Sequence, residues 1–138
     1  FNHGFTYSGH PVAAAVGIAG IKLIQTTGLL QQLQAKTIPY FVKAFQGLNN
    51  HPLVGDAQAL GMVAGLVLYQ DKEHKVLFPA DKNIGMLCRD FCFKNGIVMR
   101  AVGSRMIVAP PLVMNEALID EMIVKIRASL DATLKVVT

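Results

Sequence analysis

The sequence has no tryptophan, only two cysteines and few charged residues. Charged side chains make up 16% of the 138 residues and hydrophobic ones 52%, so the chain is too apolar to be disordered and long enough for one domain with its own core. Two cysteines cannot form a disulfide scaffold, and no signal peptide opens the sequence, which predicts a reducing, cytoplasmic location. The low charge also predicts an unusually apolar surface that is meant to be covered.

Long hydrophobic runs and clusters of basic residues are also missing. The longest apolar stretch, residues 11–24, is interrupted by Lys22 and is too short to cross a bilayer, so no membrane partner is expected. The net charge of +4 comes from 13 basic residues that are scattered along the chain, without aromatic residues interleaved among them. This distribution argues against a nucleic-acid partner.

Residues 1–11, FNHGFTYSGHP, combine glycines and hydroxyl side chains directly before an apolar helix. The pair His10-Pro11 predicts a helix start near Pro11, because proline suits the first helical turn and restricts the residue before it. Gly4 and Gly9 let the backbone bend, and hydroxyl groups beside a helix N-terminus can donate to an anion such as phosphate. The same residues are also typical of an ordinary capped turn that leads into a core helix.

The segment HGFTYSGHP, residues 3–11, resembles the HGxTYSGHP segment of the class III aminotransferases, which depend on pyridoxal 5'-phosphate (PLP). The likeness is greatest to their omega-amino-acid and amine:pyruvate transaminases. It implies that the Thr6 hydroxyl reaches across a homodimer interface to the cofactor phosphate of the partner subunit. It also implies that Phe5 lies beside the cofactor and walls the substrate pocket. The implied substrates are a small-molecule amine and a keto acid such as pyruvate.

Hydrophobic spacing and turn residues predict an α+β fold, a small antiparallel or mixed sheet with helices packed on it. A helix without a polar face is expected from residue 11 to about 26, and something outside these residues would cover it. The other expected elements are a helix over 29–48 that is kinked or restarted at Pro39, one or two strands over 54–69 with bends at Gly61 and Gly65, a charged loop over 70–83, a helix over 84–95, an antiparallel pair over 97–102 and 106–109, and a helix over 116–136 capped by Asn115.

The resemblance covers essentially the whole chain. The segment IGMLCRDFCFKNGIVMRAVGSRMIVAPPLVM, residues 84–114, is similar to the last part of the small C-terminal domain of those transaminases. By that likeness, residues 1–27 end the large PLP-binding domain and form the interdomain helix, and residues 28–138 form the small domain. The chain starts at Phe1 without a methionine, so we expect a processed chain or the C-terminal fragment of an aminotransferase.

Arg100 lies in a hydrophobic strand, VMRAV, where a guanidinium is costly to bury unless it meets an anion. Its planar fork suits bidentate binding of a carboxylate. An arginine at a strand end that reaches solvent is the commoner case among folded proteins. The segment that Arg100 opens resembles the RAxG segment of the family, which implies that this arginine binds the substrate carboxylate and swings away for amines.

Metal and hydrolase chemistry find little support in the sequence. Cys88 and Cys92 lie four residues apart on one helix face, but no histidine stands at a ligand spacing beside them, so we expect buried structural thiols. His3 and His10 are expected to form hydrogen bonds within their turn. No metal site or catalytic triad is predicted.

Departures from the family pattern limit what the resemblance implies. Gln58 stands where the family often has arginine, and Ser104 stands where an acidic or amide residue often follows the glycine. The lysine that forms the Schiff base with PLP in the family has no matching motif here and would lie upstream, so the 138-residue chain alone is expected to be inactive. The alternative is a stand-alone α+β module without catalysis that pairs through the apolar helix over residues 11–24.

Overall fold

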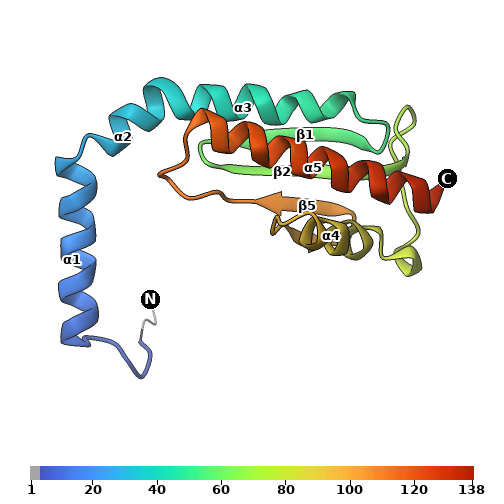
Figure 1. Cartoon of the computed structure of the whole chain (residues 1–138). Helices are drawn as coiled ribbons and strands as arrows, with labels where there is room; N and C mark the ends of the chain where they lie inside the picture. The colour runs from blue at the N-terminus through green and yellow to red at the C-terminus, as the bar shows by residue number, and fades with distance from the viewer. Residues whose placement is uncertain (1–3) are drawn as a thin grey trace.

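In the computed structural model, which describes residues 4–138, an N-terminal helix extends away from a sheet that carries the other helices (Figure 1). The helices are α1 (Pro11–Thr26), α2 (Leu29–Gln32), α3 (Ile38–Gln46), α4 (Ile84–Lys94) and α5 (Glu116–Val137). The strands are β1 (Val54–Leu60), β2 (Val63–Asp71), β3 (Val76–Leu77), β4 (Arg100–Val102) and β5 (Arg105–Val108). A π-helical segment (Leu33–Thr37) and two 3-10 segments (Gly47–Asn50 and Ala80–Lys82) complete the chain.

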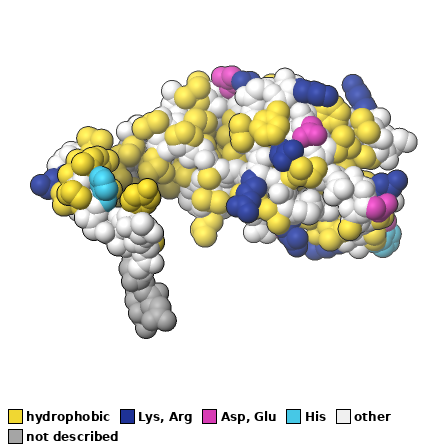
Figure 2. Space-filling model, turned by 90° about the horizontal axis from the view of Figure 1, so that it is seen from below, with side chains coloured by type: hydrophobic (Ala, Val, Ile, Leu, Met, Phe, Trp, Pro, Cys, Tyr) yellow, Lys and Arg dark blue, Asp and Glu magenta, His cyan; other side chains and the backbone are white. Residues whose placement is uncertain are grey.

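The helix α1 has the bounds that the sequence predicts, and it buries none of its residues within the chain. Lys22 is its only charged residue, so apolar side chains cover nearly all of its circumference. Figure 2 shows these hydrophobic side chains over α1, at the left of the view. Gly28 ends the helix with a φ of +67°, a left-handed conformation that glycine adopts without strain. That a surface outside this chain covers α1 stays a prediction.

The second helical stretch restarts at Pro39, as predicted. The α-helical hydrogen-bond pattern of α2 widens into a π-helical segment over Leu33–Thr37, and a regular α-helix resumes at Ile38 with Pro39 in its first turn. This placement is favourable because proline has no N–H to donate and is tolerated at a helix start. The helix α3 then buries Phe41 and Phe45 against the sheet, with their ring centroids 5.9 Å apart.

The strands form an antiparallel sheet with the order β1-β2-β5-β4, to which β3 adds a short pairing with β2. The predicted bend at Gly61 is confirmed, since this residue has a φ of +59° in the turn between β1 and β2. The predicted bend at Gly65 is wrong. Gly65 lies inside β2 and pairs with Gln58 on one side and Ile107 on the other, so both neighbouring strands hold its backbone straight.

Two further predicted boundaries differ from the structure. The charged loop over residues 70–83 contains a short hairpin, because Asp71 accepts hydrogen bonds from the backbone and ring of His74 and folds the chain back into β3. The first strand of the predicted pair starts at Arg100 instead of Ile97. The Ile97 N–H donates to the Cys92 carbonyl at the end of α4, so this part of the backbone still completes the helix terminus.

The core lies between the sheet and the helices α3, α4 and α5 (Figure 1). Asn115 caps α5 as predicted, since its Oδ1 accepts a hydrogen bond from the Leu118 N–H at 2.9 Å. The helices α3 and α5 pack on each other, and α4 packs on α5 and β4. The α+β fold predicted from the sequence is therefore confirmed.

Within residues 4–138, no single helix is both long and apolar enough to span a membrane. Only α1 taken together with the helical stretch Leu29–Asn50 meets the length and composition that a span requires, and this pair is bent by 54°.

Candidate functional site

Arg100 is the first residue of β4, where its backbone pairs with Ile107 of β5. Alternation along these two short strands directs Ala101, Met106 and Val108 toward the core, whereas Arg100 lies on the opposite face of the sheet. That face is not covered by α3, α4 or α5, and Arg100 is exposed on it. Its guanidinium makes no hydrogen bond or ion pair with any other residue of 4–138, so it is available to an anion from outside the chain.

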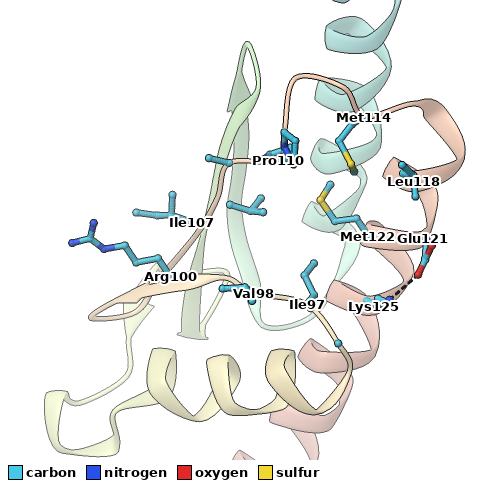
Figure 3. Close-up of a pocket in the computed structure, with 14 residues that line it drawn as sticks. Ile97, Val98, Arg100, Ile107, Pro110, Met114, Leu118, Glu121, Met122 and Lys125 are labelled. Atoms are coloured by element: carbon cyan, nitrogen blue, oxygen red, sulfur yellow. Dashed lines mark ion pairs between the residues drawn. The ribbon is translucent and has the colours of Figure 1, made fainter. Parts of the chain in front are cut away.

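A groove of about 510 Å³ begins beside Arg100 and runs between the end of β5 and the first turns of α5 (Figure 3). Its walls are mostly apolar side chains, among them Ile97, Met114 and Met122. Figure 3 shows the Arg100 guanidinium pointing away from these methionines, so the arginine marks the rim of the groove. The groove exists because Pro110 and Pro111 end the strand pairing and carry the chain away from the sheet before α5 begins.

Besides Arg100, two charged residues line the groove, Glu121 and Lys125. Their side chains meet at 2.7 Å, one turn apart on α5. The hydrogen bond from Lys125 holds the pKa of Glu121 below its ordinary value, so the carboxylate stays ionised at neutral pH. Because the charges of Glu121 and Lys125 compensate each other, Arg100 supplies the net charge of the groove. The other side chains that line the groove are apolar. Of the residues that line this groove, the sequence predicted a role only for Arg100.

The N-terminal turn has the compact geometry of a capped helix start. The Ser8 N–H donates to the Phe5 carbonyl at 2.9 Å, and the Ser8 hydroxyl accepts from the Phe5 N–H at 3.1 Å. His10 Nδ1 accepts from the Ala13 N–H at 3.3 Å, which confirms that His10 takes part in the turn. His3, to which the same role was assigned, lies outside the described residues.

The Thr6 side chain is exposed and forms no hydrogen bond with any other residue in the described part of the chain. Serine and histidine thus stabilise the turn, while the threonine hydroxyl remains free to donate to another group. Phe5 lies next to it with 66% of its surface exposed. The structure does not bring Thr6 and Arg100 together, because α1 carries the turn away from the sheet (Figure 1).

Cys88 and Cys92 are free thiols buried between α4 and α5, as the sequence predicts. A hydrogen bond to Cys92, together with burial, raises the pKa of Cys88 far above its ordinary value, so this thiol stays protonated and unreactive. No group of three or more metal-ligating side chains occurs among residues 4–138.

Comparison with known proteins identifies one protein family that matches nearly the whole chain. The family model described as aminotransferase class III matches residues 1–130. The chain is 50% identical over 133 residues to a putrescine–pyruvate aminotransferase from Pseudomonas aeruginosa, covering 96% of this chain and 29% of that protein. It is 35% identical over 133 residues to a probable mitochondrial gamma-aminobutyrate transaminase 3 from rice, with 96% of this chain and 26% of the relative covered.

Solved structures agree with the sequence matches. The crystal structure of the PMP-bound form of an aminotransferase from Vibrio fluvialis superposes with a TM-score of 0.89 and 28% sequence identity, covering all of this chain and 30% of that one. The chain therefore spans less than a third of the length of each of these similar proteins.

Proposed function

Because the chain belongs to the class III aminotransferases, enzymes that use PLP, we propose that the full-length protein transfers an amino group from a primary amine or omega-amino acid to a keto acid such as pyruvate. The observation that carries this proposal is the 50% identity over 133 residues to a relative named for this kind of reaction. A cytoplasmic location belongs to the same proposal and is supported by the two free, buried cysteines.

The proposal divides the chain at Gly28. Residues 1–27 would end the large cofactor-binding domain and form the interdomain helix, and residues 28–138 would form the small domain. Support comes from burial, because α1 buries nothing within the chain whereas every buried residue lies at Leu33 or beyond. The left-handed Gly28 separates the two parts at a natural break in the helix.

The N-terminal turn has a donor that fits a cofactor phosphate. The Thr6 hydroxyl is exposed and forms no hydrogen bond within residues 4–138, and the neighbouring turn is already stabilised without it. In the proposed homodimer, Thr6 donates a hydrogen bond to the phosphate of the cofactor in the partner subunit, and Phe5 supplies an aromatic wall beside it. The bound cofactor supplies the electron sink for amino transfer, and the protein supplies orientation and charge.

Arg100 has the chemistry to bind the carboxylate of the keto acid. Its planar guanidinium can donate two parallel hydrogen bonds to a carboxylate, and it lies unpaired beside an apolar groove. The lysine that bonds the cofactor in the family has no matching motif in this chain, so residues 1–138 by themselves should show no amino transfer.

We expect the full-length protein, supplied with PLP, an aliphatic amine and pyruvate, to form alanine. Arg100→Ala should raise the KM for pyruvate by about tenfold or more, because a charged carboxylate contact is lost, and should leave the KM of an amine donor without a carboxylate unchanged. Arg100→Lys should recover only part of the affinity, since an ammonium cannot bind both oxygens in the same way. Absence of alanine formation in the wild-type protein would overturn the proposed function.

Thr6→Ala in the full-length protein should speed the dissociation of PLP by about tenfold, because one hydrogen bond to a charged phosphate disappears. Ser8→Ala is the matched control. It removes a hydroxyl two residues away that already accepts a hydrogen bond inside the turn. Cofactor loss followed by absorbance, with equal rates in Thr6→Ala and wild type, would remove Thr6 from the site.

A further inference from the structure

A second cavity lies around the turn that joins β4 to β5. Its volume is about 400 Å³, within the usual range for small-molecule sites. The turn residues Gly103 and Ser104 form one side, and the start of α4 with the segment before it forms the other. None of its lining residues lines the groove beside Arg100, so the two sites are distinct.

Among the described residues, Arg105 is the single charged one that lines this cavity. Its side chain is exposed and makes no hydrogen bond or ion pair with any other residue of 4–138. Asp81 and Lys82 are near in sequence to the cavity wall, but neither side chain lines it. An unpaired guanidinium at a concave site is well suited to a carboxylate, which it can bind through two hydrogen bonds.

The polar groups near Arg105 are also compatible with an anion. The helix α4 starts at Ile84 in the cavity wall, and its N-cap residue Asn83 makes no side-chain capping hydrogen bond. The first N–H groups of α4 therefore add positive partial charge to that of Arg105. Ser104 also lines the cavity, and its hydroxyl forms no hydrogen bond with any other residue of 4–138.

The rest of the wall is apolar. Leu77, Phe78 and Met86 contribute to it, and Leu77 and Met86 leave more than 40% of their surface exposed. A dianion would require a second cation, whereas one arginine beside apolar walls matches a single carboxylate attached to an apolar body. The chemistry of the walls thus restricts the ligand to one class.

We propose that this cavity binds a small monocarboxylate with an apolar body, with its carboxylate on Arg105 and its body against Leu77, Phe78 and Met86. This site is separate from the substrate site proposed above, and it does not depend on amino transfer.

The test uses the full-length protein and benzoate, which combines one carboxylate with a rigid apolar ring. The measurements are made in an Arg100→Ala background, so that the proposed substrate site does not contribute to binding. Isothermal titration calorimetry should detect benzoate binding, and benzamide, which has the same shape without the charge, should bind at least tenfold more weakly. Arg105→Ala should weaken benzoate binding by about tenfold to a hundredfold, the loss expected for hydrogen bonds to a charged group.

Lys82→Ala is the matched control, because it removes an exposed positive charge beside the cavity from a side chain that does not line it. Benzoate affinity in this variant should stay within about twofold of the parent, since an exposed charge outside the site contributes little. The site is refuted if the parent does not bind benzoate, if benzamide binds equally well, or if Arg105→Ala and Lys82→Ala behave alike. Thermal unfolding at the wild-type temperature would show that the exposed Arg105 can be replaced without harm to the fold.

Discussion

The helices α1 and α5 are both long and rich in aliphatic residues, but they bury them very differently. α5 places charged residues on one side and buries Ile119, Ile126 and Leu130 on the other. α1 has no polar side and buries nothing. A helix with a polar face can be completed by the sheet and helices of its own chain. A helix without one needs a cover on several sides, which residues 4–138 do not provide, and this contrast supports the proposed division at Gly28.

The largest expected difference between the two helices concerns matched leucines. Leu130→Ala in α5 should lower the free energy of unfolding of the 138-residue chain by about 2–5 kcal/mol, because a side chain only 1% exposed leaves a cavity. Leu23→Ala in α1, where the leucine is 63% exposed, should change it by less than about 0.5 kcal/mol. Urea denaturation measures both values. Equal losses would show that α1 is already covered within the chain.

A second comparison uses one glycine from α4, which packs against other elements of the chain, and one from α1, which buries no residue within it. An added Cβ at Gly85 of α4 would lie 2.1 Å from the backbone oxygen of Gly103, so Gly85→Ala should cost about 1–3 kcal/mol through overpacking. At Gly17 of α1 nothing lies within 4 Å, and Gly17→Ala should stabilise the helix by about 0.5–1 kcal/mol. Far-UV circular dichroism during thermal unfolding reads out both changes. A destabilising Gly17→Ala would mean that another surface already approaches α1 at this position.

The smallest expected effect is on the pH dependence of the free energy of unfolding, which should depend on His51 and not on His10. His51 is 2% exposed, with Nε2 3.2 Å from Asp131 of α5 and Nδ1 accepting from the Leu53 N–H. Burial lowers the pKa of His51 despite the opposing effect of Asp131, and Arg127 and Lys72 lower it further. Below the ordinary pKa of histidine, the unfolded chain binds a proton at His51 that the folded chain does not bind. The contribution of His51 to the free energy of unfolding is therefore full above about pH 6.5 and is lost as the pH falls toward the lower folded pKa.

The loss should not exceed about 1.4 kcal/mol per pH unit. His51→Gln should flatten the stability profile between pH 7 and 5, as measured by urea denaturation across this range. His10→Gln, which changes the exposed N-cap of α1, should leave the slope in place. If the slope persists in His51→Gln, another group is responsible for it.

Local signals were sufficient to predict much of the fold. Proline at the start of α1 and Asn115 before α5 act within one helical turn, so the sequence alone predicts both helix starts. The wrong bend at Gly65 has a non-local cause, whereas the late start of β4 comes from a hydrogen bond at the end of α4. Partner strands on both sides hold Gly65 straight, and the bond from Ile97 to Cys92 keeps the backbone engaged with α4.

The candidate sites also combine features that the sequence suggests with features that depend on the packing of the fold. The residue types around Thr6 and Arg100 suggest anion binding, but resemblance to a family is what assigns them to a phosphate and a carboxylate. The two hollows could not be predicted, because each depends on how separate elements of the fold pack beside one another. One requires the segment after β5 to lie beside α5, and the other requires the turn at Gly103 to lie beside the start of α4.

Gly28 also gives α1 the properties of a lever. A helix of 16 residues is about 24 Å long, so a rotation of 10° at this joint would move the N-terminal turn by about 4 Å. Such a displacement exceeds the length of a hydrogen bond. In the proposed homodimer, the backbone torsions of this one glycine would therefore govern whether the Thr6 hydroxyl meets a phosphate, and a surface that covers α1 would have to fix the angle of the lever as well as bury its side chains.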